Sequence, residues 1–406
     1  MSFDVESIRS RFPALRREVA ARPAVFADAP GGTQVPVEVI DAMSGYLAMS
    51  NANRGGAFAT SRETDVIVEG ARSAVADFLN CEPGEVVFGP NMTTLAFALS
   101  RALVRELSEG DEVVVTRLDH DANIAPWVAA AADAGAAVRW VDFSDDFRLD
   151  LESLDAALSE RTKIVAFTLA SNALGTITDA AVVVERAKRA GAVVIADAVH
   201  FAPHRLIDVQ DLGVDVLFCS PYKFFGPHAG VMFARAELLD SWHPYKVRPS
   251  SDASPWRWET GTANHEGIAG IAACIEYLAG LVPGEGSRRT RIVDSMQEAH
   301  THQQDLTDQF LTGISKIEGV TLYGPDASNR TSTFALRVGD QDPDNTVARL
   351  GEAGVFAWSG NYYAIAVMEA LGLEESGGAV RIGFCHYSTT EEVDYVLVQL
   401  DALAHG

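Results

Sequence analysis

Cysteine is scarce in this chain. Its 406 residues include four, scattered at Cys81, Cys219, Cys274 and Cys385. No two stand in the C-x-x-C spacing of a zinc ribbon, and the set is too sparse for a disulfide framework. The pattern therefore predicts no metal site. It is also typical of a reducing compartment, so we expect a cytoplasmic protein.

Basic residues are also scarce relative to acidic ones. Lys and Arg number 32 against 56 Asp and Glu, which gives a formal net charge of −24. A protein that binds a phosphate backbone needs clustered basic residues, so this deficit excludes a nucleic-acid partner. The same charge repels anionic substrates at long range, and an anionic substrate group would need a local arginine.

Long apolar runs are absent as well. No stretch of about 18 uninterrupted apolar residues occurs, so we expect no membrane span. The first residues, MSFDVESIRSRF, lack a basic segment followed by an apolar one, and we expect no secretory signal. With 48% hydrophobic and 22% charged residues, the chain has the balance of a globular protein with one large and one smaller domain.

Short apolar runs alternate with helix-length segments from about residue 85 to 235. The runs that we expect to be strands are EVVFGP (85–90), DEVVVTRL (111–118), AAVRWVDF (136–143), KIVAFTLA (163–170), GAVVIADA (191–198), VDVLFCS (214–220) and GVMFAR (230–235). Most of these are too continuously apolar to have a solvated face. They predict an α/β fold with a mainly parallel sheet covered on both sides.

A second domain is predicted after the break VPGEGSRR at Val282–Arg289, where Pro and Gly interrupt a helical pattern. Beyond it lie a long helix, the strands VTLYG (320–324) and STFALRV (332–338), and a closing helix from about Glu391. We assign residues 21–282 to a large domain, and residues 1–20 and 283–406 to a smaller α+β domain.

Polar or reactive side chains follow four of the expected strands. They are Asp119 and His120, Ser171 and Asn172, Asp197 and His200, and Ser220, Tyr222 and Lys223. In such sheets ligands bind at the carboxyl ends of the strands, so these groups are expected to surround one crevice. Each has an ordinary structural explanation, such as a helix cap for Asp197 or a turn for Asn172. Their conjunction favours a site.

An amine, a carboxylate, an imidazole and an amide together suit a cofactor aldehyde such as pyridoxal 5'-phosphate (PLP). The amine of Lys223 can form a Schiff base, and the carboxylate of Asp197 can keep a pyridine nitrogen protonated. An imidazole can stack on the ring, and an amide can donate to the ring oxygen. A phosphate fits the start of the helix expected near Met92, in NMTT.

Several motifs resemble the class V aminotransferase superfamily of fold-type I PLP enzymes, and most closely its cysteine desulfurase branch. They are FADAPGGTQVP, DHDANIAPW, SNALGT, DAVHFAPH, SPYKFFGPHAG, WETGTAN and RIGFCHYSTTEEVD, and they extend over nearly the whole chain. The resemblance implies a fold-type I PLP-dependent enzyme. It further implies an obligate homodimer with shared active sites.

The resemblance also implies roles for individual residues. Lys223 would carry PLP, Asp197 would face the pyridinium nitrogen, and His120 would stack on the ring. Asn172 and His200 would lie beside the ring oxygen. The positions that match phosphate ligands are Met92, Thr93, Ser220, Tyr222 and, from the other subunit, Thr262. The positions that match substrate contacts are Arg381 for a carboxylate, and Arg54 and Tyr363.

One departure from the family pattern bears on the reaction. Desulfurases carry a mobile-loop cysteine that becomes a persulfide, but here the stretch reads AWSGNYYAIAVM, and Tyr363 takes the place of that cysteine. A tyrosine cannot accept sulfur. Cys385 is expected on the strand that contains Arg381, buried and about 12 Å farther along it.

We therefore expect a lyase-like β-elimination on a small amino acid. Transamination, epimerisation and a true desulfurase reaction that uses another thiol stay open, as does a non-enzymatic scaffold.

Overall fold

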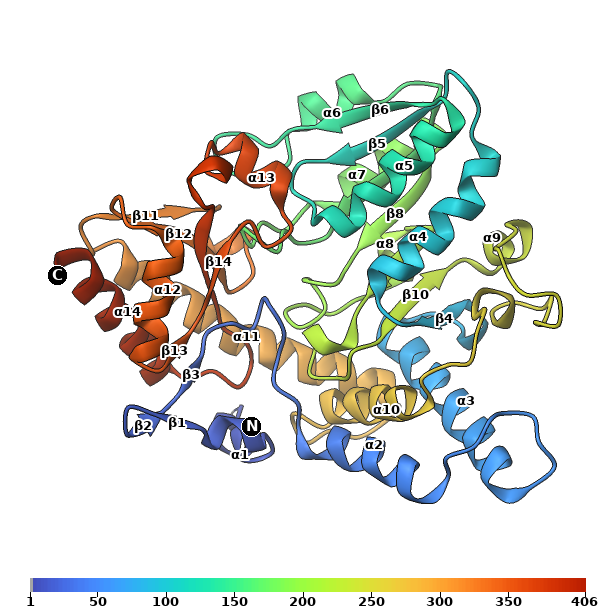
Figure 1. Ribbon diagram of the computed structural model, residues 1–406, viewed down its shortest axis with the longest axis horizontal. Helices are drawn as coiled ribbons and strands as arrows, with labels where there is room; N and C mark the ends of the chain where they lie inside the picture. The colour runs from blue at the N-terminus through green and yellow to red at the C-terminus, as the bar shows by residue number, and fades with distance from the viewer. Residues whose placement is uncertain (1–2) are drawn as a thin grey trace.

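A seven-stranded sheet forms the centre of the larger unit (Figure 1) in this computed structural model, which describes residues 3–406. Its order is β4-β10-β9-β8-β7-β5-β6. The strands are β4 (Val86–Gly89), β5 (Glu112–Thr116), β6 (Ala137–Val141), β7 (Thr162–Thr168), β8 (Val193–Asp197), β9 (Val216–Cys219) and β10 (Gly230–Ala234). Only β10 runs against its neighbours. All seven predicted strands and the mainly parallel sheet are confirmed.

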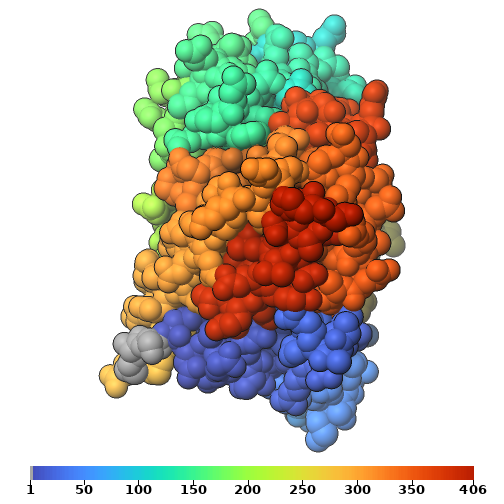
Figure 2. All heavy atoms as spheres, turned by 90° about the vertical axis from the view of Figure 1, so that its left-hand side faces the viewer, coloured from blue at the N-terminus to red at the C-terminus, as the bar shows by residue number. Residues whose placement is uncertain are grey.

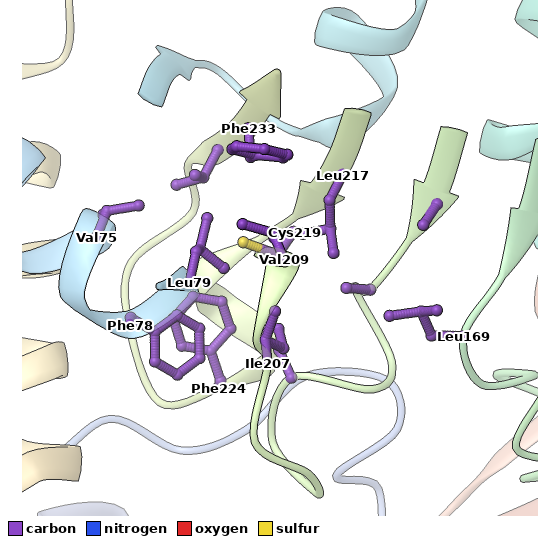
Figure 3. Close-up of a cluster of buried hydrophobic side chains, with 14 of the residues drawn as sticks. Val75, Phe78, Leu79, Leu169, Ile207, Val209, Leu217, Cys219, Phe224 and Phe233 are labelled. Carbon is purple, nitrogen blue, oxygen red and sulfur yellow. The ribbon is translucent and has the colours of Figure 1, made fainter. Parts of the chain in front are cut away.

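Helices cover both faces of this sheet, because its central strands are apolar on both sides. Alternate residues of β5 show the division: Val113 and Val115 join the core beneath α4 (Met92–Leu103) and α5 (Ala125–Ala134), and Val114 joins the opposite core. That second core lies against α3 (Ala59–Leu79), α7 (Ala180–Arg189) and α10 (His265–Ala279). Figure 3 shows Leu79 of α3 pointing towards Cys219 of β9, and Phe78 beside Phe224.

The smaller unit is built on a four-stranded antiparallel sheet of order β11-β12-β15-β14. Its strands are β11 (Val320–Tyr323), β12 (Thr333–Val338), β15 (Ala379–Gly383) and β14 (Trp358–Gly360). Its core includes side chains of α11 (Arg288–Ile314), α12 (Pro343–Glu352) and α14 (Thr390–His405). Figure 2 views the molecule from this side, with α14 in red at the centre. The two predicted strands and the closing helix are confirmed.

The remaining elements connect these parts. They are α1 (Val5–Ser10), β1 (Glu18–Val19), β2 (Arg22–Pro23), β3 (Val25–Phe26), α2 (Val37–Met49), α6 (Leu151–Ala157), α8 (Val209–Leu212), α9 (Ala236–Ser241), β13 (Val355–Phe356) and α13 (Ile365–Ala370). The parallel pair of β3 with β13 brings the chain after Phe26 beside the smaller sheet.

Helix α11 belongs to both cores. Its first half contributes Ile292 and Met296 to the core of the large sheet, and its second half contributes Leu306 and Phe310 to the smaller core. Near the amino terminus, Phe12 packs into the larger core. The predicted division at residues 20 and 282 stays a prediction, because the packing passes continuously through this helix.

One strand ends earlier than expected. β15 stops at Gly383, so the prediction that the strand continues through Cys385 is wrong. The physical reason is a turn at Cys385–Ser388: the Cys385 N–H donates to Oγ of Ser388 at 3.2 Å, and the Cys385 carbonyl accepts the Ser388 N–H at 2.9 Å, so neither group pairs with a neighbouring strand. Within residues 3–406 no helix is long and apolar enough to cross a membrane.

Candidate functional site

A pocket opens at the carboxyl ends of the parallel strands. Its lining residues are Asn91, Met92, Thr93, His120, Ala122, Thr168, Ala170, Asn172, Asp197, Val199, His200, Ser220, Tyr222 and Lys223. Nine of the predicted site residues are thus brought together from chain segments more than 100 residues apart. The parallel sheet explains this, since its strand ends share one edge.

Lys223 lies in a short 3₁₀ turn, Pro221–Lys223, that follows β9. Its Nζ donates to the carbonyl oxygens of Pro30 (2.5 Å) and Gly31 (3.0 Å). Burial, followed by the charge of Arg381, lowers the pKa of this amine to about 7. A substantial fraction of the amine is therefore neutral near pH 7, as a nucleophile or base requires.

Two carboxylates lie near this amine. Asp197, at the end of β8, is buried, and its Oδ1 accepts the N–H of Val199 at 2.7 Å. Burial raises its pKa to about 6. Asp28 was missed by the sequence reasoning. Its Oδ1 has no hydrogen-bond partner among the described residues, and burial raises its pKa to about 6, opposed by Arg381 and Lys223.

The imidazole of His120 forms one wall of the pocket. Its Nδ1 accepts the N–H of Ala122 at 3.0 Å, which leaves the proton of the neutral ring on Nε2. Burial first, then the charges of Lys223 and Arg381, lower the pKa of His120 to about 3, so the ring is neutral at pH 7. Tyr363 stacks on it, with ring centroids 5.4 Å apart and planes 18° apart.

Arg381 projects from β15 and is buried beside the pocket wall. Its Nη1 donates to the carbonyl of Asn172 at 3.0 Å, and its guanidinium lies 4.4 Å from the ring centroid of Tyr362. Its Nε has no partner among the described residues. Burial lowers the pKa of Arg381 to about 10, so it stays charged at pH 7. A buried cation with an unused donor is suited to a carboxylate.

The turn of residues 361–364 covers this arginine. Tyr362 and Tyr363 both have left-handed backbone conformations, with φ of 54° and 59°. Each costs about 1–3 kcal/mol and persists only where its surroundings enforce it. Here the Asp121 N–H donates to the Tyr363 carbonyl at 2.7 Å, Nδ2 of Asn172 donates to the Tyr362 carbonyl at 3.0 Å, and the Tyr362 hydroxyl donates to the Ala379 carbonyl.

The start of α4 faces the same pocket. Oδ1 of Asn91 caps the helix by accepting the N–H of Thr94 at 2.8 Å, and the Met92 N–H donates to Oγ of Ser220 at 3.2 Å. No protein acceptor for the Thr93 N–H is found within residues 3–406. An anion at this helix start would meet a free donor and the positive end of the helix dipole.

Four predicted residues are not among those that line the pocket of this chain. Arg381 and Tyr363 adjoin the lining residues Asn172 and His120, whereas the other two lie apart from it. Arg54 pairs with Asp65 (2.9 Å) and Glu69 (2.7 Å) on α3, and Thr262 is exposed on the surface. Their roles as a substrate contact and as a phosphate ligand in the other subunit stay predictions.

None of the four thiols lines the pocket. Cys385 is fully buried in the core of the larger unit, and burial raises the pKa of its thiol to about 12. Burial also raises the pKa of Cys81, Cys219 and Cys274. A thiol with so high a pKa holds little thiolate at pH 7, and only the thiolate is strongly nucleophilic. The described residues also contain no cluster of His, Cys, Asp or Glu that could hold a metal ion.

The pocket residues fit PLP. An amine of lowered pKa, a buried carboxylate, a neutral imidazole wall and a free helix N–H are its complementary groups. The unpaired buried Nε of Arg381 is a donor that the carboxylate of an amino acid would satisfy.

Known proteins resemble the chain over almost its full length. Residues 25–396 match the family model described as aminotransferase class-V. An uncharacterized protein of Mycobacterium tuberculosis is 33% identical over 99% of this chain and 100% of its own. A cysteine desulfurase of Enterobacter sp. is 32% identical over 100% of this chain and 99% of its own. An apo structure of a cysteine desulfurase from Thermococcus onnurineus has a TM-score of 0.89 at 27% identity, over 99% of this chain and 98% of that one.

Proposed function

Because this chain belongs to the aminotransferase class-V family of PLP-dependent enzymes, we propose that it removes a β-substituent from a small amino acid without a persulfide cysteine. The observation that carries the proposal is the turn at Tyr362 and Tyr363. Tyr363 of this turn stacks on His120, and the resemblance to desulfurases assigns their persulfide cysteine to its position. The four cysteines all lie outside the pocket.

Different residues of the chain bind the substrate, balance the charges of the site and transfer protons. The Arg381 guanidinium holds the substrate carboxylate, and Asp28 and Asp197 are the nearby negative charges that balance the cationic amine and arginine. When bound on Lys223, PLP supplies an electron sink for negative charge at Cα. Asp197 would support that sink as the buried carboxylate that keeps the pyridine nitrogen of the cofactor protonated.

Lys223 moves the protons. Once the amino group of the substrate has replaced it on the cofactor, its amine is free again and, with a pKa of about 7, would take the proton from Cα as that C–H bond breaks. The bond from Cβ to sulfur then breaks, and its electron pair leaves with the sulfur as sulfide or a thiol. One water molecule then hydrolyses the remaining unsaturated product, which releases ammonia and a 2-oxo acid.

Two exposed aromatic side chains near the pocket indicate the size of the substrate side chain. Tyr363 is 70% exposed on the His120 side, and Trp358 is 54% exposed beside Gly31, whose carbonyl accepts from Lys223. Exposed aromatic surfaces next to His120 and to Gly31 favour a β-substituent larger than a bare thiol. A homodimer completes the proposal, with the exposed Thr262 of each subunit contributing to the phosphate site of the other.

The test is a product screen with purified holoenzyme. A panel of cysteine and its S-alkyl and S-aryl derivatives is assayed for 2-oxo acid, ammonia, sulfide and thiol. We expect equal amounts of thiol and 2-oxo acid. Intact-mass analysis after incubation is expected to find no protein-bound sulfur, in the natural chain and in a Cys385→Ser variant alike.

A persulfide on Cys385, with activity lost in Cys385→Ser, would establish a true desulfurase instead. Conversion of substrate to a keto acid with no released thiol or sulfide would indicate transamination, and inversion at Cα alone would indicate epimerisation.

A further inference from the structure

His200 makes an unusual contact with the smaller unit. It lies three residues beyond the end of β8 and lines the pocket, but its Nε2 lies 3.0 Å from Oγ1 of Thr333 and 3.2 Å from Oγ1 of Thr331. Thr333 is the first residue of β12, in the smaller sheet. The two threonines are thus more than 130 positions from His200 in sequence and belong to the other unit of the fold.

The hydrogen bonds of the two hydroxyls distinguish their roles. Oγ1 of Thr331 has another acceptor, the Gly175 carbonyl at 3.4 Å, which also accepts the Thr331 N–H at 2.9 Å. Within residues 3–406, the Thr333 hydroxyl has no acceptor other than Nε2 of His200. A buried hydroxyl proton needs an acceptor. Thr333 therefore donates to Nε2, which must carry a lone pair rather than a proton.

The other ring nitrogen of His200 then carries the proton. Burial lowers the pKa of His200 well below its usual range, so the ring is neutral and holds one N–H. Nδ1 makes no hydrogen bond within the described chain. It is nevertheless not among the fully buried side-chain nitrogens and oxygens that lack a partner, so it has some accessible surface. On a side chain that is 3% exposed, an accessible nitrogen faces the open space of the pocket.

We propose that Thr333 is a positioning residue that fixes the tautomer of His200, so that an Nδ1–H donor points into the pocket. This step rests on the proposed function: when PLP is bound, the donor would be available to the ring oxygen of the cofactor. A lone pair at Nδ1 would instead oppose an oxygen acceptor. Such outer hydrogen bonds determine which histidine nitrogen is available for chemistry.

The position of Thr333 is itself firmly held. The buried Arg330 donates to the carbonyls of Pro325 (2.7 Å), Leu174 (3.2 Å) and Thr333 (2.6 Å). These bonds join the start of β12 to the loop that contains Asn172. The smaller sheet thereby contributes to the chemistry of the pocket through one hydroxyl.

The experiment determines directly which ring nitrogen of His200 carries the proton. Apoprotein labelled with ¹⁵N-histidine is studied by long-range ¹H–¹⁵N correlation, and His200 is assigned from the signals lost in His200→Gln. We expect the natural chain to carry the proton on Nδ1. In Thr333→Val the donor is lost, and the proton is expected to move to Nε2, where Oγ1 of Thr331 can accept it. Thr333→Ser keeps a hydroxyl and is expected to keep the Nδ1–H form.

Thr331→Val is the matched control, since it removes the neighbouring hydroxyl but leaves the Thr333 donor. It is expected to keep the Nδ1–H tautomer. In the holoenzyme, Thr333→Val is expected to lower kcat roughly tenfold or more, with KM changed by less than about threefold. An Nε2–H form in the natural chain, or an unchanged tautomer in Thr333→Val, would overturn the proposal. Because the NMR measurement uses apoprotein, it stands even if the proposed reaction fails.

Discussion

At the scale of single residues, the amine of Lys223 gives the most direct prediction. Its pKa of about 7 means that its neutral, reactive fraction rises as pH increases through 7. Apoprotein mixed with PLP and trapped with borohydride should be labelled on Lys223, with a half-maximal initial rate near pH 7. Exposed lysines, with ordinary pKa values near ~10.4, should react little below pH 9.

Peptide mapping by mass spectrometry checks both the location and the pH profile. Lys223→Arg should abolish the adduct, and the control Lys163→Arg, at a half-exposed lysine near Asp111, should leave it unchanged. Asp28→Asn removes a charge that favours the protonated amine, so the midpoint should move to lower pH. An adduct on another lysine, or a midpoint above pH 9, would contradict the assigned role of Lys223.

Asp197 gives a second prediction at this scale. Asp197→Asn keeps the size of the side chain and an acceptor for the Val199 N–H, so the holoenzyme should still bind PLP. A neutral amide cannot hold the facing nitrogen protonated, and the rate should fall by roughly two to four orders of magnitude. Cofactor absorbance and steady-state kinetics together check this. Activity within a few-fold of the natural chain would contradict it.

At the scale of elements, the turn 361–364 is held by contacts rather than by its own backbone preference. Asn172→Ala removes the Nδ2 donor to the Tyr362 carbonyl and should release part of a strained turn. The lost hydrogen bond is worth about 1 kcal/mol, so amide exchange in peptides covering 360–366 of the apoprotein should be roughly fivefold faster.

Hydrogen–deuterium exchange by mass spectrometry measures this, with peptides from α10 as the internal reference. Asn329→Ala, which removes a side-chain bond to Asp326 in an exposed turn, is the matched control and should leave 360–366 unchanged. Unchanged exchange in Asn172→Ala would mean that the contacts of Asp121 and Tyr362 hold the turn alone.

The comparison of sequence with structure also belongs to the element scale. Lys223, Asp197 and His120 could be predicted because each follows an apolar run, and parallel strands end at one edge. Asp28 could not, because the β3–β13 pair places it, and such two-residue strands have no periodic pattern. The role of Thr333 could not be predicted for a related reason, because its contact with His200 joins two units of the fold that are distant in sequence. The end of β15 depends on the turn in which Ser388 bonds to the backbone of Cys385, a contact that the apolar run did not reveal.

At the scale of the whole molecule, a single chain exposes large apolar side chains at the end of α2, just before α3 and within α3. Met49 is 77% exposed, Phe58 58% and Val66 73%. Large apolar side chains left in solvent are typical of an interface. The exposed Thr262, which does not reach the pocket of its own chain, fits a site completed by a second copy.

Subunit mixing tests whether the two sites are shared. Lys223→Ala lacks the amine, and Thr262→Asp should repel the cofactor phosphate, so each homodimer should be inactive. In a mixed dimer with shared sites, the intact Lys223 of one chain meets the intact Thr262 of the other, and one site of two is restored. Random reassembly after mild denaturation should therefore recover about a quarter of the natural activity. If Thr262 served the site of its own chain, both sites of every mixed dimer would carry a defect, and no activity would return. Sedimentation velocity on the same samples separates that result from a failure to reassemble, because reassembled dimers without activity would contradict the shared site.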